Sequence, residues 1–260
     1  MNRMRKALVC FVLSFFTVTC TGNAAGGDIP LGSCAQRQYL KNDLIVCHFA
    51  GDMDIRLFLN DDEGNPFRHF NFVNDWLGHG DETLRFAMNA GMYHKDRSPV
   101  GLYVERAEML TSLNSRDGPG NFHLKPNGVF WISGEGEKRT AGVSAAEVYS
   151  DARGDIIFAT QSGPMLVIDG KLHPRFIEGS ESLKRRNGVG VDRDGDVWFV
   201  LSDTPLNFFS FATYFRDVLE TPNALYLDGT ISRIFAPSLG RNDPGVPMGP
   251  IVGVVAPVTD

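Results

Sequence analysis

The stretch VGVDRDGDVWFVLS, residues 189–202, has the pattern of a β-hairpin. Apolar and aromatic residues flank a short polar segment, and Asp194-Gly195 is a dipeptide typical of tight turns. The letters DRDGD, residues 192–196, also resemble the start of a calcium-binding loop. The glutamate that completes such a loop is absent, and the segment lies between two strand patterns. We therefore predict two antiparallel strands joined by a turn, and no metal site here.

Short apolar runs of the same kind recur along the chain, separated by glycine-containing turns, and they predict further strands. The runs are LIVCHFA (44–50), DIRLFLN (54–60), LRFAMNA (84–90), GLYVE (101–105), GVFWIS (128–133), IIFAT (156–160), MLVIDG (165–170), ALYLDG (224–229) and IVGVVAP (251–257). Such a series of strands indicates a protein that consists mainly of β-sheet.

Helix patterns are fewer. Between Asn207, a suitable N-cap, and Pro222, the apolar residues recur at helical spacing, with Phe208, Phe211, Ala212, Phe215, Val218 and Leu219 on one face. We interpret this aromatic stripe as part of the core. A weaker helix pattern covers residues 67–77. With no repeat or linker in the sequence, the prediction is one α+β domain over residues 26–260, with an extensive mixed or antiparallel sheet and a few flanking helices.

The N-terminus has the features of a secretory signal peptide. Three basic residues precede the apolar run ALVCFVLSFFTVT (7–19), and small residues follow in GNAAGG (22–27). We predict cleavage after Ala25, so that residues 1–25 are the leader, because the apolar run is too short to span a bilayer comfortably. Lipidation of Cys20 is an alternative, but Thr17 and Thr19 fit poorly the small and aliphatic residues that such sites favour. The expected location is periplasmic or secreted, without stable membrane insertion.

Charge and cysteine content agree with that location. The sequence has 31 acidic and 25 basic residues, three of them in the leader, so the mature chain is strongly acidic. This balance argues against nucleic acid or an anionic membrane as the main partner. Outside the leader region only Cys34 and Cys47 remain, and in an oxidising compartment we expect them to form a disulfide. Two free thiols of a reactive site are the alternative, although no CxxC or histidine motif accompanies them.

Several common catalytic motifs are absent. The six histidines are scattered, without HExxH spacing, so a zinc site is not predicted. Ser162 lacks the surrounding GxSxG of a serine hydrolase, and there is no P-loop or GxGxxG. No cofactor or metal is therefore expected.

Four polar-glycine segments each follow a predicted strand. They are MNAGMY (88–93), TQSGPML (160–166), RRNGVGVD (185–192) and LYLDGT (225–230). Each alone is consistent with a turn, and Asp228-Gly229 is a common turn dipeptide. Together they suggest strand ends that converge on one polar pocket, with Asp228 at its wall.

In this order the four segments resemble the phosphodiester glycosidases, the family of the uncovering enzyme N-acetylglucosamine-1-phosphodiester α-N-acetylglucosaminidase. The likeness is closest to secreted bacterial members and includes NFHLKPNGVFW (121–131). It covers most of residues 40–256. Two departures concern the pocket: Ala90, Met92 and Tyr93 replace the family's Asn-Gly-Gly-Phe-Phe pattern, and Thr230-Ile231-Ser232 replace glycines.

The resemblance implies a set of site residues in this chain. Asp228 and Arg186 correspond to the catalytic positions, and the implied substrate-binding positions are Asn89, Gly91, Ser162, Gly163, Gly190, Gly229 and Thr230. The glycines allow a ligand to approach the backbone. A structural turn at Asp228 and an exposed charge at Arg186 remain alternatives.

The implied reaction is hydrolysis of the C1–O bond of a sugar-1-phosphodiester, which releases a sugar and a phosphate monoester. Arg186 would bind the phosphate oxygens, since guanidinium groups pair with them in two-pronged fashion. Asp228 would act as nucleophile, water-activating base or electrostatic stabiliser of an oxocarbenium-like centre. The partner is then a glycan or sugar phosphate. The alternative is a carbohydrate-binding protein without turnover, which the larger residues at 230–232 favour.

Overall fold

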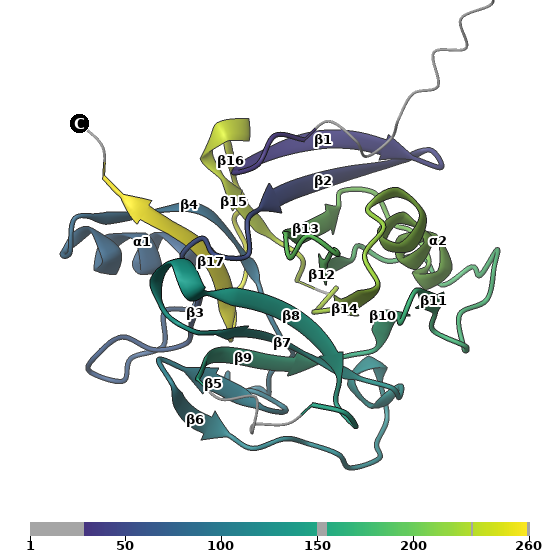
Figure 1. Cartoon of the computed structure of the whole chain (residues 1–260), viewed down its shortest axis with the longest axis horizontal. Coiled ribbons are helices and arrows are strands. Elements are labelled where there is room, and N and C mark those ends of the chain that lie inside the picture. The colour runs from purple at the N-terminus through teal and green to yellow at the C-terminus, as the bar shows by residue number, and fades with distance from the viewer. Residues whose placement is uncertain (1–28, 150–154, 230, 259–260) are drawn as a thin grey trace, which may run out of the picture.

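The computed structural model describes residues 29–149, 155–229 and 231–258. Within these ranges the chain forms one seven-stranded and two five-stranded sheets, in which neighbouring strands are antiparallel (Figure 1). Two short α-helices accompany them. The predicted α+β class with extensive antiparallel sheet is confirmed. The leader (1–25), Cys20 and Thr230 lie outside the described residues.

The seven-stranded sheet holds the hairpin from which the prediction started. Its strands, in spatial order, are β1 (Ser33–Tyr39), β2 (Asn42–Phe49), β13 (Val197–Ser202), β12 (Asn187–Val191), β14 (Asn223–Tyr226), β10 (Met165–Ile168) and β11 (Lys171–Leu172). β12 and β13 pair from Asn187↔Leu201 to Val191↔Val197, as predicted. In the turn, the carboxylate of Asp192 accepts the N–H groups of Asp194 and Asp196 at 3.0 and 2.9 Å.

The two smaller sheets contain the remaining strands. One has the order β16 (Arg241–Asn242), β15 (Ile234–Ala236), β4 (Glu82–Asn89), β17 (Ile251–Pro257) and β3 (Ile55–Phe58). The other has the order β6 (Glu108–Thr111), β5 (Tyr103–Glu105), β9 (Ile156–Ser162), β7 (Gly128–Ser133) and β8 (Thr140–Ala145).

The helices lie where the sequence patterns place them. α1 (Phe70–Gly78) contacts β4, and α2 (Phe208–Thr213) lies beside β10 and β11 (Figure 1). The Asn207 side chain accepts the N–H of Ser210 at 2.8 Å, so the predicted N-cap is confirmed. α2 continues into a π-helical turn, η4 (Tyr214–Val218). Three 3₁₀ turns complete the set: η1 (Asn121–His123), η2 (Gly136–Lys138) and η5 (Pro237–Leu239).

One apolar cluster contains residues of all three sheets. Phe199 of the seven-stranded sheet lies 4.9 Å from Phe86 of β4 and 5.9 Å from Phe130 of β7, measured between ring centroids. All three side chains are at most 1% exposed. Burial of one such ring contributes about 1.5–3 kcal/mol to stability. The stripe on α2 and η4 packs in a second cluster, as predicted.

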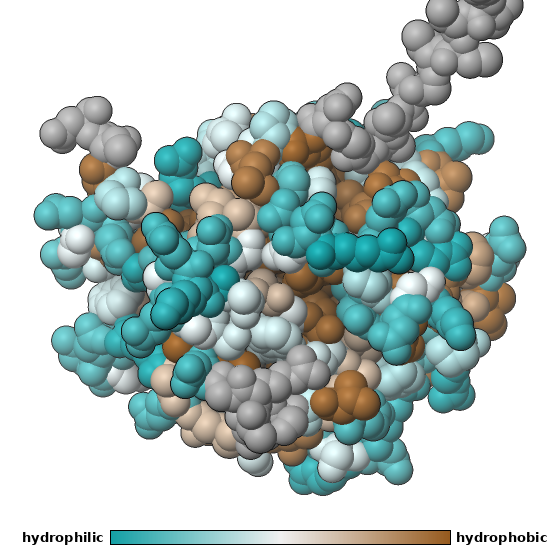
Figure 2. Space-filling view, viewed as in Figure 1, coloured by the Kyte–Doolittle hydropathy of each residue, from teal (hydrophilic) through white to brown (hydrophobic). Residues whose placement is uncertain are grey.

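Cys34 and Cys47 form a disulfide between directly paired positions of β1 and β2, with their Cα atoms 4.0 Å apart. The predicted pairing is confirmed. Among the described residues, no helix combines the length and apolar character needed to cross a membrane. The face in Figure 2 shows apolar residues only as small separate patches among polar ones.

Candidate active site

Asp228 lies where the chain leaves β14 of the seven-stranded sheet and passes toward β15 of a five-stranded sheet. Both backbone groups of Asp228, the N–H and the carbonyl, form hydrogen bonds with side chains. Its N–H donates to Oδ1 of Asn187 at 2.8 Å, and its carbonyl accepts from Nδ2 of Asn89 at 3.0 Å and from Oγ of Ser232 at 3.1 Å. The N–H of Ser232 also donates to the carbonyl of Gly229 at 3.2 Å. Asp228-Gly229 therefore does belong to a turn, which is fixed by Asn89 of β4, by Asn187 of β12 and by Ser232 of the turn itself.

The two asparagines connect the sheets at this point. Asn187 is fully buried, Asn89 is 1% exposed, and Nδ2 of Asn187 donates to the carbonyl of Asn89 at 2.8 Å. Oδ1 of Asn89 accepts the N–H of Arg233 at 2.9 Å. The amide of Asn89 is thus engaged with backbone at both ends. It positions Asp228 and Arg233, a role that differs from the substrate contact implied by the family resemblance.

Ser162 and the glycines support the same junction. Ser162 is fully buried and donates its hydroxyl to the carbonyl of Leu227, next to Asp228. A Cβ on Gly91 would lie 2.8 Å from the carbonyl oxygen of Gln161, and one on Gly163 would lie 2.6 Å from Cβ of Asn127. These glycines permit close packing between strands, because a side chain has no room there.

Gly190 lies apart from this group. A Cβ there would be 2.9 Å from both Phe215 and Thr221, so this glycine lets the π-helical turn pack on β12. The structure does not bring it into contact with Asp228.

Gly229 lines a cavity of about 510 Å³. The lining also includes Asn121, Lys184, Arg185, Arg186 and Tyr226, and no acidic side chain is among the lining residues. A Cβ on Gly229 would collide with the hydroxyl of Tyr226, so glycine is needed to keep that phenol against the turn. The cavity therefore has a basic lining beside the turn that carries Asp228.

Arg186 is buried, with 1% of the residue exposed, so the alternative of an exposed charge is wrong. Its Nε donates to the carbonyl of Leu206 at 2.9 Å and its Nη2 to that of Ser182 at 3.0 Å. The guanidinium carbon lies 3.6 Å from the ring centroid of Phe208, a cation–π contact. Burial lowers the pKa of Arg186, and Tyr226 opposes this. Within the described ranges Arg186 forms no ion pair.

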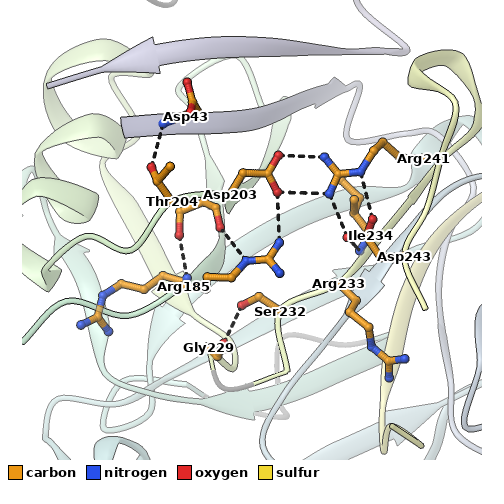
Figure 3. Close-up of polar contacts among 12 residues, drawn as sticks. Asp43, Arg185, Asp203, Thr204, Gly229, Ser232, Arg233, Ile234, Arg241 and Asp243 are labelled. Carbon is orange, nitrogen blue, oxygen red and sulfur yellow. Dashed lines mark hydrogen bonds and ion pairs between the residues drawn. The ribbon is translucent and has the colours of Figure 1, made fainter. Parts of the chain in front are cut away.

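Arg185 differs from its neighbour because its charge is compensated. Its Nη2 donates to Oδ1 of Asp203 at 3.0 Å, and Arg241 binds the same carboxylate through both oxygens at 2.7 and 3.1 Å. Arg241 also pairs with Asp243. Figure 3 shows this network close to Gly229 and Ser232. This network connects the strands and loops around the site. Among the described residues, the guanidinium of Arg186 in the cavity lining has no carboxylate partner.

Two tyrosines experience the charge of Asp228. Burial, and then the Asp228 carboxylate, raise the pKa of Tyr226 to about 12, while Arg186 opposes the shift. Burial and Asp228 also raise the pKa of Tyr93, opposed by Arg97 and Arg233. Both phenols therefore remain protonated at neutral pH, and the hydroxyl of Tyr93 donates to the carbonyl of Pro247 at 3.3 Å. Sequence reasoning named neither as a site residue, although both lie in quoted segments, MNAGMY and LYLDGT.

The described residues also contain a possible ligand group on the hairpin, His48, Asp192 and Asp196. Nε2 of His48 lies 3.0 Å from Oδ2 of Asp196, and Trp198 Nε1 donates to Asp192 at 2.7 Å. None of these residues lines the cavity beside Gly229. The group stabilises the hairpin turn and takes no part in the site around Asp228.

Comparison with known proteins agrees with this arrangement. The family model for phosphodiester glycosidases matches residues 82–254. An uncharacterized protein of Escherichia coli K12, YigE, is 39% identical over 152 residues, which are 58% of this chain and 58% of YigE. The match thus spans less than two thirds of that relative.

Solved structures share the fold at low sequence identity. The catalytic domain of zebrafish N-acetylglucosamine-1-phosphodiester α-N-acetylglucosaminidase, auto-inhibited by its pro-peptide, has a TM-score of 0.57 and 12% identity, over 85% of this chain and 81% of that one. An exported protein of Burkholderia pseudomallei has a TM-score of 0.55 and 10% identity, over 82% and 74% of the two chains. Because the family model covers most of the sequence, including the segments that meet at Asp228, the chain belongs to the phosphodiester glycosidase family.

Proposed function

We propose that the protein is a secreted hydrolase that cleaves the C1–O bond of a sugar-1-phosphodiester. Family membership supports this, and one observation carries it. A buried, unpaired guanidinium, that of Arg186, lines a basic cavity at the turn of Asp228. A buried charge is costly unless it is paired, so such a cavity favours an anionic ligand.

Another hollow of similar size in the described part of the chain supports the choice of this cavity. It lies beside α1, has a volume of about 490 Å³, and is lined by Asp61, Asp62, Glu63 and Asp75. Four carboxylates repel a phosphodiester. Of the two, the cavity at Gly229 is the one whose charge suits the substrate.

In the proposed reaction, water adds to the anomeric carbon, the C1–O bond breaks, and the oxygen leaves with the phosphate. The leaving group is a phosphate monoester, a weak base, so charge neutralisation matters more than a strong general acid. Arg186 would neutralise the phosphate, with Tyr226 donating a hydrogen bond. Asp228 would stabilise the developing positive charge at C1 or act on it directly, as base or nucleophile.

The location proposed is outside the cytoplasm. The leader predicted for residues 1–25 supports it, and so does the Cys34–Cys47 disulfide, because such bonds persist in oxidising compartments. A signal-cleaved protein purified from periplasm or medium, with its N-terminus at Gly26, is the expected result of N-terminal sequencing.

The test uses a sugar-1-phosphodiester in ¹⁸O-labelled water. We expect release of free sugar with the label at C1, whereas a phosphodiesterase would place the label on phosphate. Asp228→Asn should lower kcat by roughly two or more orders of magnitude, because the amide keeps the size and loses the charge. Asp217→Asn is the matched control, since that carboxylate pairs on the surface with the adjacent Arg216. Tight binding without release of sugar from any phosphodiester would instead indicate the binding protein.

A further inference from the structure

Arg233 is a second buried guanidinium near Asp228, and it lies on the side of the five-stranded sheet. It directly precedes β15, and 6% of the residue is exposed. Nη2 donates to the carbonyl of Val246, while Nε is buried without a hydrogen-bond partner. Figure 3 shows its guanidinium directed away from the ion pairs that Asp203 forms with Arg185 and Arg241.

The charge of Arg233 has no carboxylate partner in the described part of the chain. Asp243 acts on it from a distance, opposing the lowering of its pKa by burial. However, both oxygens of Asp243 are already bound by Nε and Nη2 of Arg241, each at 2.9 Å. A buried guanidinium with an unused donor is expensive to maintain, so its position suggests that an anion binds there.

The surroundings of Arg233 are basic and aromatic. Burial, and then Arg233 and Arg68, lower the pKa of His69. Arg97 lies with its guanidinium carbon 5.2 Å from the ring centroid of Tyr93. Arg233 and Arg97 both counteract the raised pKa of Tyr93, so both positive charges lie close enough to act on this phenol.

Arg233 and Arg186 approach the Asp228 turn from different sheets. The amide of Asn89 accepts the N–H of Arg233 at one end and donates to the carbonyl of Asp228 at the other, whereas Arg186 lines the cavity together with Gly229. Arg186 belongs to the side of the seven-stranded sheet, directly before β12, and Arg233 to the side of β15. A substrate with its anomeric carbon at Asp228 and its phosphate at Arg186 therefore extends its sugar toward Arg233.

We propose that Arg233 binds an oxyanion carried by the sugar itself. The substrate class is then a 1-phosphodiester of an acidic sugar, either a uronic acid or a sugar with a second phosphate. The inference rests on the proposed function for the placement of phosphate and C1. Guanidinium suits either anion, because its fork matches carboxylate and phosphate oxygens.

Three matched substrates test the inference: the methyl phosphodiesters of α-D-glucose 1-phosphate and of α-D-glucuronic acid 1-phosphate, and the same glucose diester with a 6-phosphate. We expect kcat/KM to be at least about tenfold higher for one acidic substrate than for the neutral one, and the better acid identifies the anion. Arg233→Gln should lower this acidic-to-neutral ratio about 10- to 100-fold, and Arg233→Lys should lower it less. The control Arg193→Gln, on the exposed tip of the hairpin, should leave the ratio unchanged.

An acidic-to-neutral ratio of kcat/KM of one or below in the wild type overturns the inference. An equal loss of kcat/KM for all substrates in Arg233→Gln also overturns it, because that result would place the phosphodiester at Arg233. If no substrate is hydrolysed, the proposed function fails, and calorimetry still decides the inference. Either glucuronic acid 1-phosphate or glucose 1,6-bisphosphate should then bind the Asp228→Asn protein more tightly than glucose 1-phosphate does, and Arg233→Gln added to that protein should abolish the difference. Equal binding of all three compounds would refute the subsite.

Discussion

Asn187 offers a direct test of how Asp228 is held. The change Asn187→Ala removes two buried hydrogen bonds, one from the N–H of Asp228 and one to the carbonyl of Asn89. It also leaves those two backbone groups without their partner in a place where Asn187 is fully buried. At about 1–2 kcal/mol for each group, the expected loss in the free energy of unfolding is about 2–4 kcal/mol. This is a large part of the stability of an ordinary domain.

The same change should also slow the reaction. Asp228 would keep its charge but lose the contact that fixes its backbone, and a shift of about 1 Å in a reacting group costs roughly 100-fold in rate. We therefore expect kcat to fall while KM changes little.

Urea unfolding followed by fluorescence gives the stability, and steady-state hydrolysis gives the rate. Asn42→Ala is the matched control, because the side chain of Asn42 likewise forms two hydrogen bonds to backbone groups, the carbonyls of Tyr39 and Leu40, in the exposed β1–β2 turn. Its loss should be below about 1 kcal/mol, with normal kcat. If Asn187→Ala unfolds at the same urea concentration as Asn42→Ala, the reasoning about the buried junction is refuted.

Three further predictions concern separate parts of the molecule. Replacing Cys34 and Cys47 by alanine should cost about 3 kcal/mol of unfolding free energy, and the unreduced wild type should show no alkylatable thiol among residues 26–260. Burial raises the pKa of Glu105 from 4.5 to about 7. The protonated side chain therefore contributes fully to stability below pH 4.5, and this contribution is lost as the pH rises toward 7. Urea unfolding at a series of pH values should show this decrease in the free energy of unfolding, and Glu105→Gln should remove it. Arg186→Lys should weaken both binding and turnover of phosphodiesters, because lysine cannot form the paired hydrogen bonds of a guanidinium group. The effect should be smaller on a substrate whose leaving group is neutral. Equal effects on both substrates would contradict the assignment of Arg186 to the phosphate.

Much of the fold follows from local patterns, and two of the strands that were not predicted, β1 and β8, show why others escape them. All nine apolar runs and the hairpin became strands. β1 was not predicted because it is an edge strand of mostly polar residues, SCAQRQY, that pairs only with β2. β8 was not predicted because it consists of small residues; Gly142 there lies against the ring of Trp131, which leaves no room for a larger side chain. Strand order depends on contacts far apart in the sequence, and no local pattern encodes it.

Helix limits were less exact than helix positions. The pattern at 67–77 became α1 from Phe70 to Gly78, because Arg68 adopts a left-handed backbone conformation, with φ of 61°, just before it. The 208–219 pattern changes from α to π after Thr213. The apolar face of this segment is still buried. The spacing of its apolar residues indicates which face packs against the core, and the wider π-helical turn does not change that face.

The site shows the same division between what a sequence can and cannot reveal. Polar-glycine segments after strands indicated where strand ends meet, and hydrogen bonds do join Asn89, Ser162, Asn187 and the Asp228 turn. However, the first three use their side chains on backbone groups and form the support of the turn. Arg233, the group proposed to select an acidic sugar, follows the segment LYLDGT and belongs to none of the four motifs. A motif of glycine and small polar residues marks where strands can approach closely. A long side chain such as that of Arg233 reaches the site from just before β15, so its place there is known only from the three-dimensional structure.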